Sequence, residues 1–136
     1  MTDTNKAHLL LVVEDDEALH GVLDVGLSDH GFELIVAKDG SQALAELEAG
    51  AVRFKALVTD VRLGEGPTGW DVAHRARELV PNLPVVYVSG DSSQEWAAHG
   101  VPESIMLQKP FVIAQLVTAV TTLMNQATTT LPSPTE

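Results

Sequence analysis

Short apolar segments alternate with amphipathic segments along the chain, and this alternation restricts the fold more than any other feature. The apolar segments have the length and β-branched character of buried strands, and they lie at residues 8–13, 32–37, 55–60, 85–88 and 104–108. Between them, apolar residues recur at helical spacing, as Leu19, Leu23 and Leu27 do. Strand–helix alternation predicts an α/β domain, a parallel sheet with helices on both faces.

The predicted elements occupy residues 8–126, which is enough chain for one domain with a sizeable core. Residues 1–7 are polar, form a predicted N-terminal tail and do not look like a signal peptide. Residues 127–136 are rich in Thr and Pro, and we expect them to form a disordered C-terminal tail. The sequence therefore predicts one folded domain between two short tails.

Polar residues stand where the apolar segments end. Asp60 closes the third segment, Glu14 and Asp15 follow the first, Ser89 follows the fourth, and Lys109 follows the fifth. The carboxyl ends of parallel strands meet at one edge of the sheet, where such folds bind ligands. We therefore expect these five side chains to lie together.

This set of residues suits the transfer of a phosphoryl group. Carboxylates crowded together need a compensating cation, and oxygen ligands without Cys or a His pair suit Mg²⁺. Lys109 would add a positive charge and Ser89 a hydroxyl donor, so a metal, a cation and a neutral donor would surround the phosphoryl group. An Asp carboxylate such as Asp60 can itself be the nucleophile, which gives an aspartyl phosphate.

Each of these residues also has a simpler interpretation. Asp60 could end its strand only to cap the next element. The acidic run 14–17 could only favour a helix N-terminus, Lys109 could be a solvated lysine, and Ser89-Gly90 could be a plain turn. Their coincidence at strand ends favours the functional site over these separate explanations.

Charge and composition exclude several classes of partner. The net charge of −11 disfavours binding to nucleic acid or to an anionic membrane. No apolar run approaches the roughly 20 residues of a membrane span. The chain has no cysteine, which fits a cytoplasmic protein.

Four motifs together resemble the receiver (phosphoacceptor) domain of two-component response regulators. They are the segment 11–16, Val58-Thr59-Asp60 with the later Gly69, the segment 86–90, and the segment 107–111. They fall in order at suitable spacings, and the resemblance covers residues 8–126. It implies a flavodoxin-like, doubly wound, five-stranded parallel sheet in the order 2-1-3-4-5.

The resemblance also implies a role for each site residue. Asp60 accepts a phosphoryl group from a histidine kinase or a histidine phosphotransfer protein. Ser89 hydrogen-bonds the phosphoryl group and Lys109 pairs with one of its oxygens. Mg²⁺ is held by Asp15, Asp60 and the backbone carbonyl of Arg62, with help from Glu14 through water. The peptide bond between Lys109 and Pro110 is expected to be cis.

Three segments depart from the family pattern. Many members carry an aromatic residue in the middle of the fifth strand that turns inward on phosphorylation, whereas the matching residue here is Met106. The loop from Asp60 to Gly69 is longer by one residue than is common and resembles that of hybrid-kinase receivers. The segment 92–103 is atypical, so we expect a remodelled signalling surface.

The leading hypothesis is a single-domain response regulator that is a phosphoacceptor and not an enzyme. Its output would be contact with an unidentified downstream protein, or it would serve as a phosphoryl shuttle or sink. The chain could also form a homodimer. The alternatives are a receiver module of a hybrid histidine kinase and a pseudo-receiver that binds partners without phosphorylation. A haloacid-dehalogenase-like phosphatase is disfavoured, because it needs an acid two residues after the nucleophile and Arg62 stands there.

Overall fold

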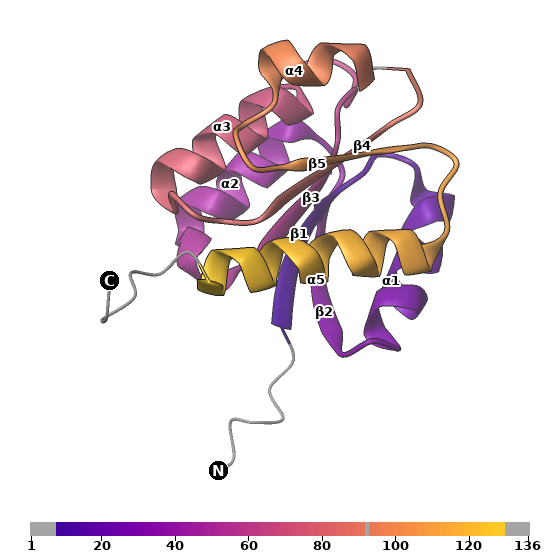
Figure 1. Cartoon of the computed structure of the whole chain (residues 1–136). Helices are drawn as coiled ribbons and strands as arrows, with labels where there is room; N and C mark the ends of the chain where they lie inside the picture. Colours follow the sequence, from indigo (N-terminus) through magenta and orange to yellow (C-terminus); the bar gives the residue numbers. More distant parts are fainter. Residues whose placement is uncertain (1–7, 92, 130–136) are drawn as a thin grey trace, which may run out of the picture.

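Five parallel strands form one sheet in the order β2-β1-β3-β4-β5 (Figure 1). The computed structural model describes residues 8–91 and 93–129. The strands are β1 (His8–Val13), β2 (Phe32–Ala37), β3 (Ala56–Asp60), β4 (Val85–Ser89) and β5 (Ile105–Gln108). This confirms the predicted α/β sheet and its strand order.

Helices cover both faces of the sheet (Figure 1). In chain order the helical elements are α1 (Glu17–Ser28), α2 (Gly40–Gly50), the 3₁₀ turn η2 (Ala51–Arg53), α3 (Gly69–Leu79), the 3₁₀ turn η3 (Ser93–Glu95), α4 (Trp96–His99) and α5 (Ile113–Thr129). One buried cluster joins the sheet to α2 and α3, and a second joins it to α1 and α5.

The central strands contribute side chains to both clusters, which explains why these strands are apolar without alternation. In β1, Leu11 and Val13 enter the cluster under α2 and α3, whereas Leu10 and Val12 enter the cluster under α1 and α5. Successive side chains of a strand point to opposite faces, so a strand between two helix layers has no polar position.

Short polar side chains cap the helices that follow the strands. Asp16 is the N-cap of α1 and accepts a hydrogen bond from the backbone N–H of Ala18. Thr68 is the N-cap of α3 and forms a capping box with Asp71. Such caps satisfy N–H groups that the first helical turn leaves unpaired, which fixes where α1 and α3 begin.

Helix α5 continues to Thr129, beyond the boundary at residue 126 expected from composition. Ala127 is a strong helix former, and the proline that restricts the backbone comes only at position 132. The expected tails at 1–7 and 130–136 lie outside the described residues.

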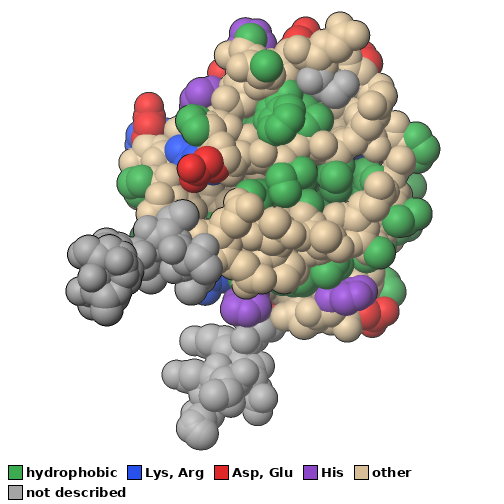
Figure 2. Space-filling view, in the orientation of Figure 1, with side chains coloured by type: hydrophobic (Ala, Val, Ile, Leu, Met, Phe, Trp, Pro, Cys, Tyr) green, Lys and Arg blue, Asp and Glu red, His purple; other side chains and the backbone are tan. Residues whose placement is uncertain are grey.

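Helix α4 is a single turn without a buried residue, so it covers little of β5. Figure 2 shows hydrophobic side chains gathered between α4 and α5, on the face where β5 lies. An open pocket of about 440 Å³ lies here, with Ile105 and Leu107 of β5 and Ala114 and Ala119 of α5 in its wall. The expectation that the segment 92–103 departs from the family pattern stays a prediction.

Candidate functional site

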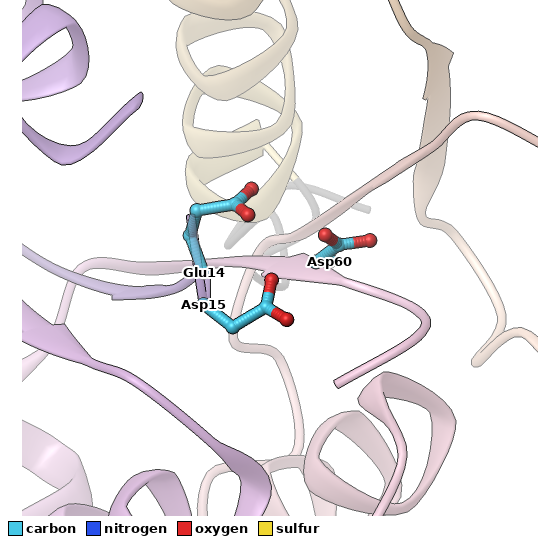
Figure 3. Close-up of side chains that lie close together, drawn as sticks. All are labelled: Glu14, Asp15 and Asp60. Atoms are coloured by element: carbon cyan, nitrogen blue, oxygen red, sulfur yellow. The ribbon is translucent and has the colours of Figure 1, made fainter. Parts of the chain in front are cut away.

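Three carboxylates meet at the carboxyl edge of the sheet (Figure 3). Glu14 and Asp15 follow β1 and Asp60 ends β3, and one oxygen from each lies within 4.8 Å of the others. Glu14 is 2% exposed and Asp60 is 7% exposed, whereas Asp15 is exposed. The cluster is thus open to solvent on the side of Asp15 and enclosed behind it.

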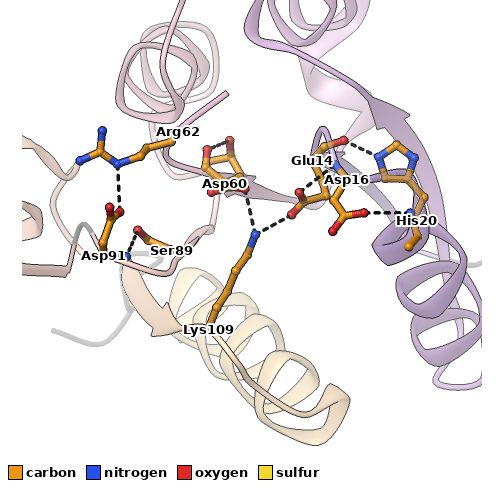
Figure 4. A network of polar contacts seen from close by, with 10 residues as sticks. Glu14, Asp16, His20, Asp60, Arg62, Ser89, Asp91 and Lys109 are labelled. Carbon is orange, nitrogen blue, oxygen red and sulfur yellow. Dashed lines mark hydrogen bonds and ion pairs between the residues drawn. The ribbon is translucent and has the colours of Figure 1, made fainter. Parts of the chain in front are cut away.

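Lys109 supplies the positive charge that this cluster needs (Figure 4). Its Nζ donates to Oδ2 of Asp60 at 2.9 Å and to Oε1 of Glu14 at 3.1 Å. The backbone N–H of Lys109 donates to the carbonyl of Ser89 at 2.8 Å, which holds the start of the β5–α5 loop beside β4. The peptide bond to Pro110 is cis, as predicted.

Burial and the neighbouring charges together shift the pKa values of two groups in the cluster. Burial raises the pKa of Glu14, and the negative charge of Asp60 adds to the rise, although the N–H of Asp16 and the charge of Lys109 oppose it. Burial by itself lowers the pKa of Lys109, but its hydrogen bonds and charge interactions with Asp60 and Glu14 outweigh burial and raise that pKa. Lys109 is therefore held in its charged form between two acids.

The backbone carbonyl of Glu14 accepts a hydrogen bond from the ring of His20 in α1. One oxygen of the Glu14 carboxylate also accepts from the backbone N–H of Asp16, at 3.1 Å. These contacts fix Glu14 between the end of β1 and the start of α1.

Ser89 lies on the other side of Asp60, at the end of β4, and is 1% exposed. Its hydroxyl accepts a hydrogen bond from the backbone N–H of Asp91 at 3.2 Å. The carboxylate of Asp91 in turn accepts from Nε of Arg62 at 2.9 Å (Figure 4). An exposed ion pair therefore joins the loop after β3 to the loop after β4.

Gly69 explains how the loop after Asp60 returns so closely to the strand. A Cβ at this position would lie 2.1 Å from the carbonyl oxygen of Asp60. The N–H of Gly69 donates to the carbonyl of Val61 at 2.9 Å, which closes the loop. Only glycine allows this approach, so the Gly69 of the sequence motif has a steric role.

The donor set fits a hard divalent cation. The oxygens of Glu14, Asp15 and Asp60 lie close enough to share one ion, and carboxylate oxygens are the ligands that Mg²⁺ prefers. The described residues contain no other cluster of three or more His, Cys, Asp or Glu side chains that could hold a metal.

The structure brings the sequence-predicted side chains Glu14, Asp15, Asp60 and Lys109 together, and Ser89 lies at the same edge of the sheet. The individual roles of these residues stay predictions, as does the carbonyl ligand from Arg62. Sequence reasoning missed the link from Arg62 to Asp91 and the contact of His20. The only signal for Asp91 was its place in the polar turn after Ser89, and nothing local marked His20.

Comparison with known proteins gives consistent matches. The family model of the response regulator receiver domain matches residues 10–121. The transcriptional regulatory protein PrrA of Mycobacterium tuberculosis is 34% identical over 131 residues, which are 93% of this chain and 54% of PrrA. The chain thus spans about half the length of these curated relatives.

Solved structures agree in fold and in sequence. A response regulator receiver protein from Sinorhizobium medicae WSM419 superposes with a TM-score of 0.86 at 43% identity, covering 90% of this chain and 98% of that chain. The receiver domain of the hybrid histidine kinase CckA gives a TM-score of 0.71 at 29% identity, covering 85% and 98%.

None of the helices in the described part of the chain has the length and apolar character that crossing a membrane requires. Three observations agree on the family of this chain. They are the strand order of the sheet, the carboxylates with their lysine at one edge, and the family match over most of the chain. The chain belongs to the response regulator receiver domain family of two-component signalling.

Proposed function

We propose that Asp60 accepts a phosphoryl group from a histidine kinase or a histidine phosphotransfer protein, with Mg²⁺ bound at the acidic cluster. The observation that carries this proposal is the placement of Asp60, which is 7% exposed, 2.9 Å from Nζ of Lys109 and close to the oxygens of Glu14 and Asp15. Receiver domains in general are phosphoacceptors and not enzymes, and this chain would act in the same way.

In the proposed step, a carboxylate oxygen of Asp60 attacks the phosphorus of a phosphohistidine. A new O–P bond forms as the P–N bond breaks, and the electron pair of that bond stays on the imidazole. When bound, Mg²⁺ would neutralise charge on the phosphoryl oxygens, with Asp15, Asp60 and the carbonyl of Arg62 as ligands and Glu14 acting through water.

Lys109 and Ser89 would complete the surroundings of the phosphoryl group. Lys109 already touches the carboxylate of Asp60, so its ammonium would pair with an oxygen of the bound phosphoryl group. Ser89, at the end of the next strand, would turn its hydroxyl to donate a hydrogen bond. Both are interactions that strengthen as charge builds on the transferred group.

The phosphorylated domain would alter a surface that a downstream protein binds, as a cytoplasmic single-domain response regulator. The match to a response regulator receiver protein from Sinorhizobium medicae WSM419 supports this form. The likeness to the CckA receiver favours a second form, a receiver module within a hybrid histidine kinase. The site chemistry is the same in both forms.

Intact mass after incubation with acetyl phosphate, with and without Mg²⁺, tests the proposal. We expect wild type to gain one phosphoryl group only with Mg²⁺, and Asp60→Asn to gain none. Asp24→Asn, which removes an exposed carboxylate of α1, is the matched control and should label like wild type.

Two other outcomes would contradict the proposal. Rapid turnover of the donor without a lasting adduct would indicate a phosphatase. An unlabelled wild-type chain, beside a control receiver that labels, would indicate a pseudo-receiver.

A further inference from the structure

Tyr87 lies two residues before Ser89 on β4, and its side chain is fully buried. Residues i and i+2 of a strand point to the same face, so Tyr87 and Ser89 share the face that α3 covers. A shift of the end of β4 at Ser89 would therefore move the backbone that carries the ring of Tyr87.

The hydroxyl of Tyr87 is bonded to the segment between α4 and β5. The backbone N–H of Val101 donates to it at 3.0 Å, and both groups are buried. The carbonyl of Val101 accepts from the hydroxyl of Ser104 at 2.7 Å, and Ser104 accepts from the indole N–H of Trp96 at 2.9 Å. A chain of hydrogen bonds thus runs from β4 through Val101 to the exposed turn α4.

The ring of Tyr87 is held so that its hydroxyl moves only with the strand. Trp70 of α3 packs on it, with ring centroids 4.7 Å apart and an interplanar angle of 57°. Met106 of β5 is its neighbour across the sheet and belongs to the same packed cluster. Because the ring has no exposed surface and a large neighbour on one side, rotation out of this position is sterically blocked.

Helix α4 contributes no buried side chain to the core and is held by few contacts. Its neighbourhood is held by side-chain contacts to the backbone, such as that of His74 to the carbonyl of His99 at 2.8 Å. A pocket of about 280 Å³ separates it from the loop after β3, with Arg62, Trp70 and His99 in its wall. An element held in this way responds to small changes in its few contacts.

We propose that Tyr87 is a positioning residue that transmits the phosphorylation state of Asp60 to α4. The inference rests on the proposed function. When Ser89 turns toward the phosphoryl group, the end of β4 shifts, the hydroxyl of Tyr87 carries the N–H of Val101 with it, and Trp96 follows through Ser104. The signal passes by translation of a fixed ring in β4, without rotation of an aromatic residue in β5.

The test uses the full chain with Mg²⁺ and beryllofluoride, a mimic of the phosphoryl group on aspartate. The ¹⁹F signal of bound beryllofluoride reports whether the site fills, and ¹H–¹⁵N spectra report the amide of Val101 and the indole N–H of Trp96. In wild type we expect filling to shift both resonances. In Tyr87→Phe, which keeps the ring and removes the acceptor, we expect equal filling but shifts less than half as large. In the neighbouring control Met106→Leu, both should stay at wild-type size.

A second variant keeps the test valid if Tyr87→Phe folds poorly. Val101→Pro removes the same hydrogen bond from the donor side, and the extended backbone of Gly100 before it accepts a following proline. Its readout is the indole of Trp96, whose shift should also fall below half.

The outcomes separate the two proposals. A filled site with full responses in Tyr87→Phe, or with responses lost only in Met106→Leu, overturns the role of Tyr87 alone. A wild-type chain that binds no beryllofluoride overturns the proposed function, and the inference with it, because no signal would enter β4. A lowered melting temperature of Tyr87→Phe with intact responses would show a merely structural residue.

Discussion

Glu14 is the residue whose surroundings conflict most with its charge. It is 2% exposed, lies beside Asp60, and has a pKa raised first by burial and then by that neighbouring carboxylate. The contact of Lys109 at 3.1 Å reduces the conflict without removing it. Such a residue lowers the stability of the metal-free fold, and a function that needs a negative charge would explain its presence.

Replacing Glu14 by Gln should therefore raise the melting temperature in Mg²⁺-free buffer at neutral pH and weaken Mg²⁺ binding. The raised pKa means that the folded state holds the proton of Glu14 more tightly than the unfolded state does. Wild type thus recovers stability as pH falls through that raised pKa, and the advantage of Glu14→Gln should vanish toward pH 4.5.

Thermal melts of Glu14→Gln between pH 7 and pH 4.5, with EDTA, measure this difference. Glu33→Gln, at an exposed position of β2, is the matched control and should show no such gain. A gain from Glu14→Gln that stays constant with pH would contradict the electrostatic origin.

Helix α3 holds the segment that leads into β5 through the side chain of Arg77. Arg77 donates from Nε to the carbonyl of Leu83 at 2.7 Å, and from its two other nitrogens to the carbonyls of Pro102 and Glu103 at 2.7 Å and 3.1 Å. Glu103 has a positive φ of 58°, a conformation that non-glycine residues adopt rarely. The three hydrogen bonds hold this irregular backbone in place between two regular elements.

Arg77→Ala should lower the free energy of unfolding by about 2 kcal/mol, because three carbonyls lose a charged donor. Arg75→Ala, two residues earlier on the same helix, removes ion pairs with Glu48 and Glu78. Those pairs are solvent-exposed and contribute little, so Arg75→Ala should lower the free energy of unfolding by less than Arg77→Ala does.

Urea unfolding of both variants gives the comparison. An equal or larger loss for Arg75→Ala would show that the surface charges, and not the carbonyl contacts of Arg77, stabilise α3.

At the scale of the molecule, acidic charge and the site are linked. The chain carries 19 acidic and 8 basic residues, and three of the acids converge at one edge of the sheet. Repulsion within such a chain disfavours the compact state. A divalent cation bound at that edge would relieve the most concentrated part of this repulsion.

Mg²⁺ should consequently raise the melting temperature beyond the effect of NaCl at the same ionic strength. At a free concentration 100 times the dissociation constant, the added stability is about 2.7 kcal/mol. Differential scanning calorimetry of wild type and Asp15→Asn measures it, with Asp29→Asn, at the exposed end of α1, as the control. A Mg²⁺ effect that survives in Asp15→Asn would place the ion elsewhere.

Sequence could predict what depends on neighbours in the chain. The continuous apolar segments of β1 and β4 are typical of strands buried on both faces. Asp16 and Thr68 are residue types that favour helix N-termini, and both are N-caps in the structure. The convergence of Glu14, Asp60 and Lys109 followed from one topological rule. Contacts between distant segments could not be predicted in this way, because Arg77 with Pro102 and Tyr87 with Val101 meet only through packing.

The order of the strands in the sequence also determines when, during synthesis, the site can be complete. Asp60 ends β3 and Glu14 and Asp15 follow β1, so all three are translated before Lys109, which follows β5, the fifth strand of this sheet in chain order. A nascent chain without β5 carries the acids but lacks their cation. Under the proposed function, such a chain lacks the ammonium group that pairs with the phosphoryl group, so signalling has to wait until the segment that carries Lys109 has joined the sheet.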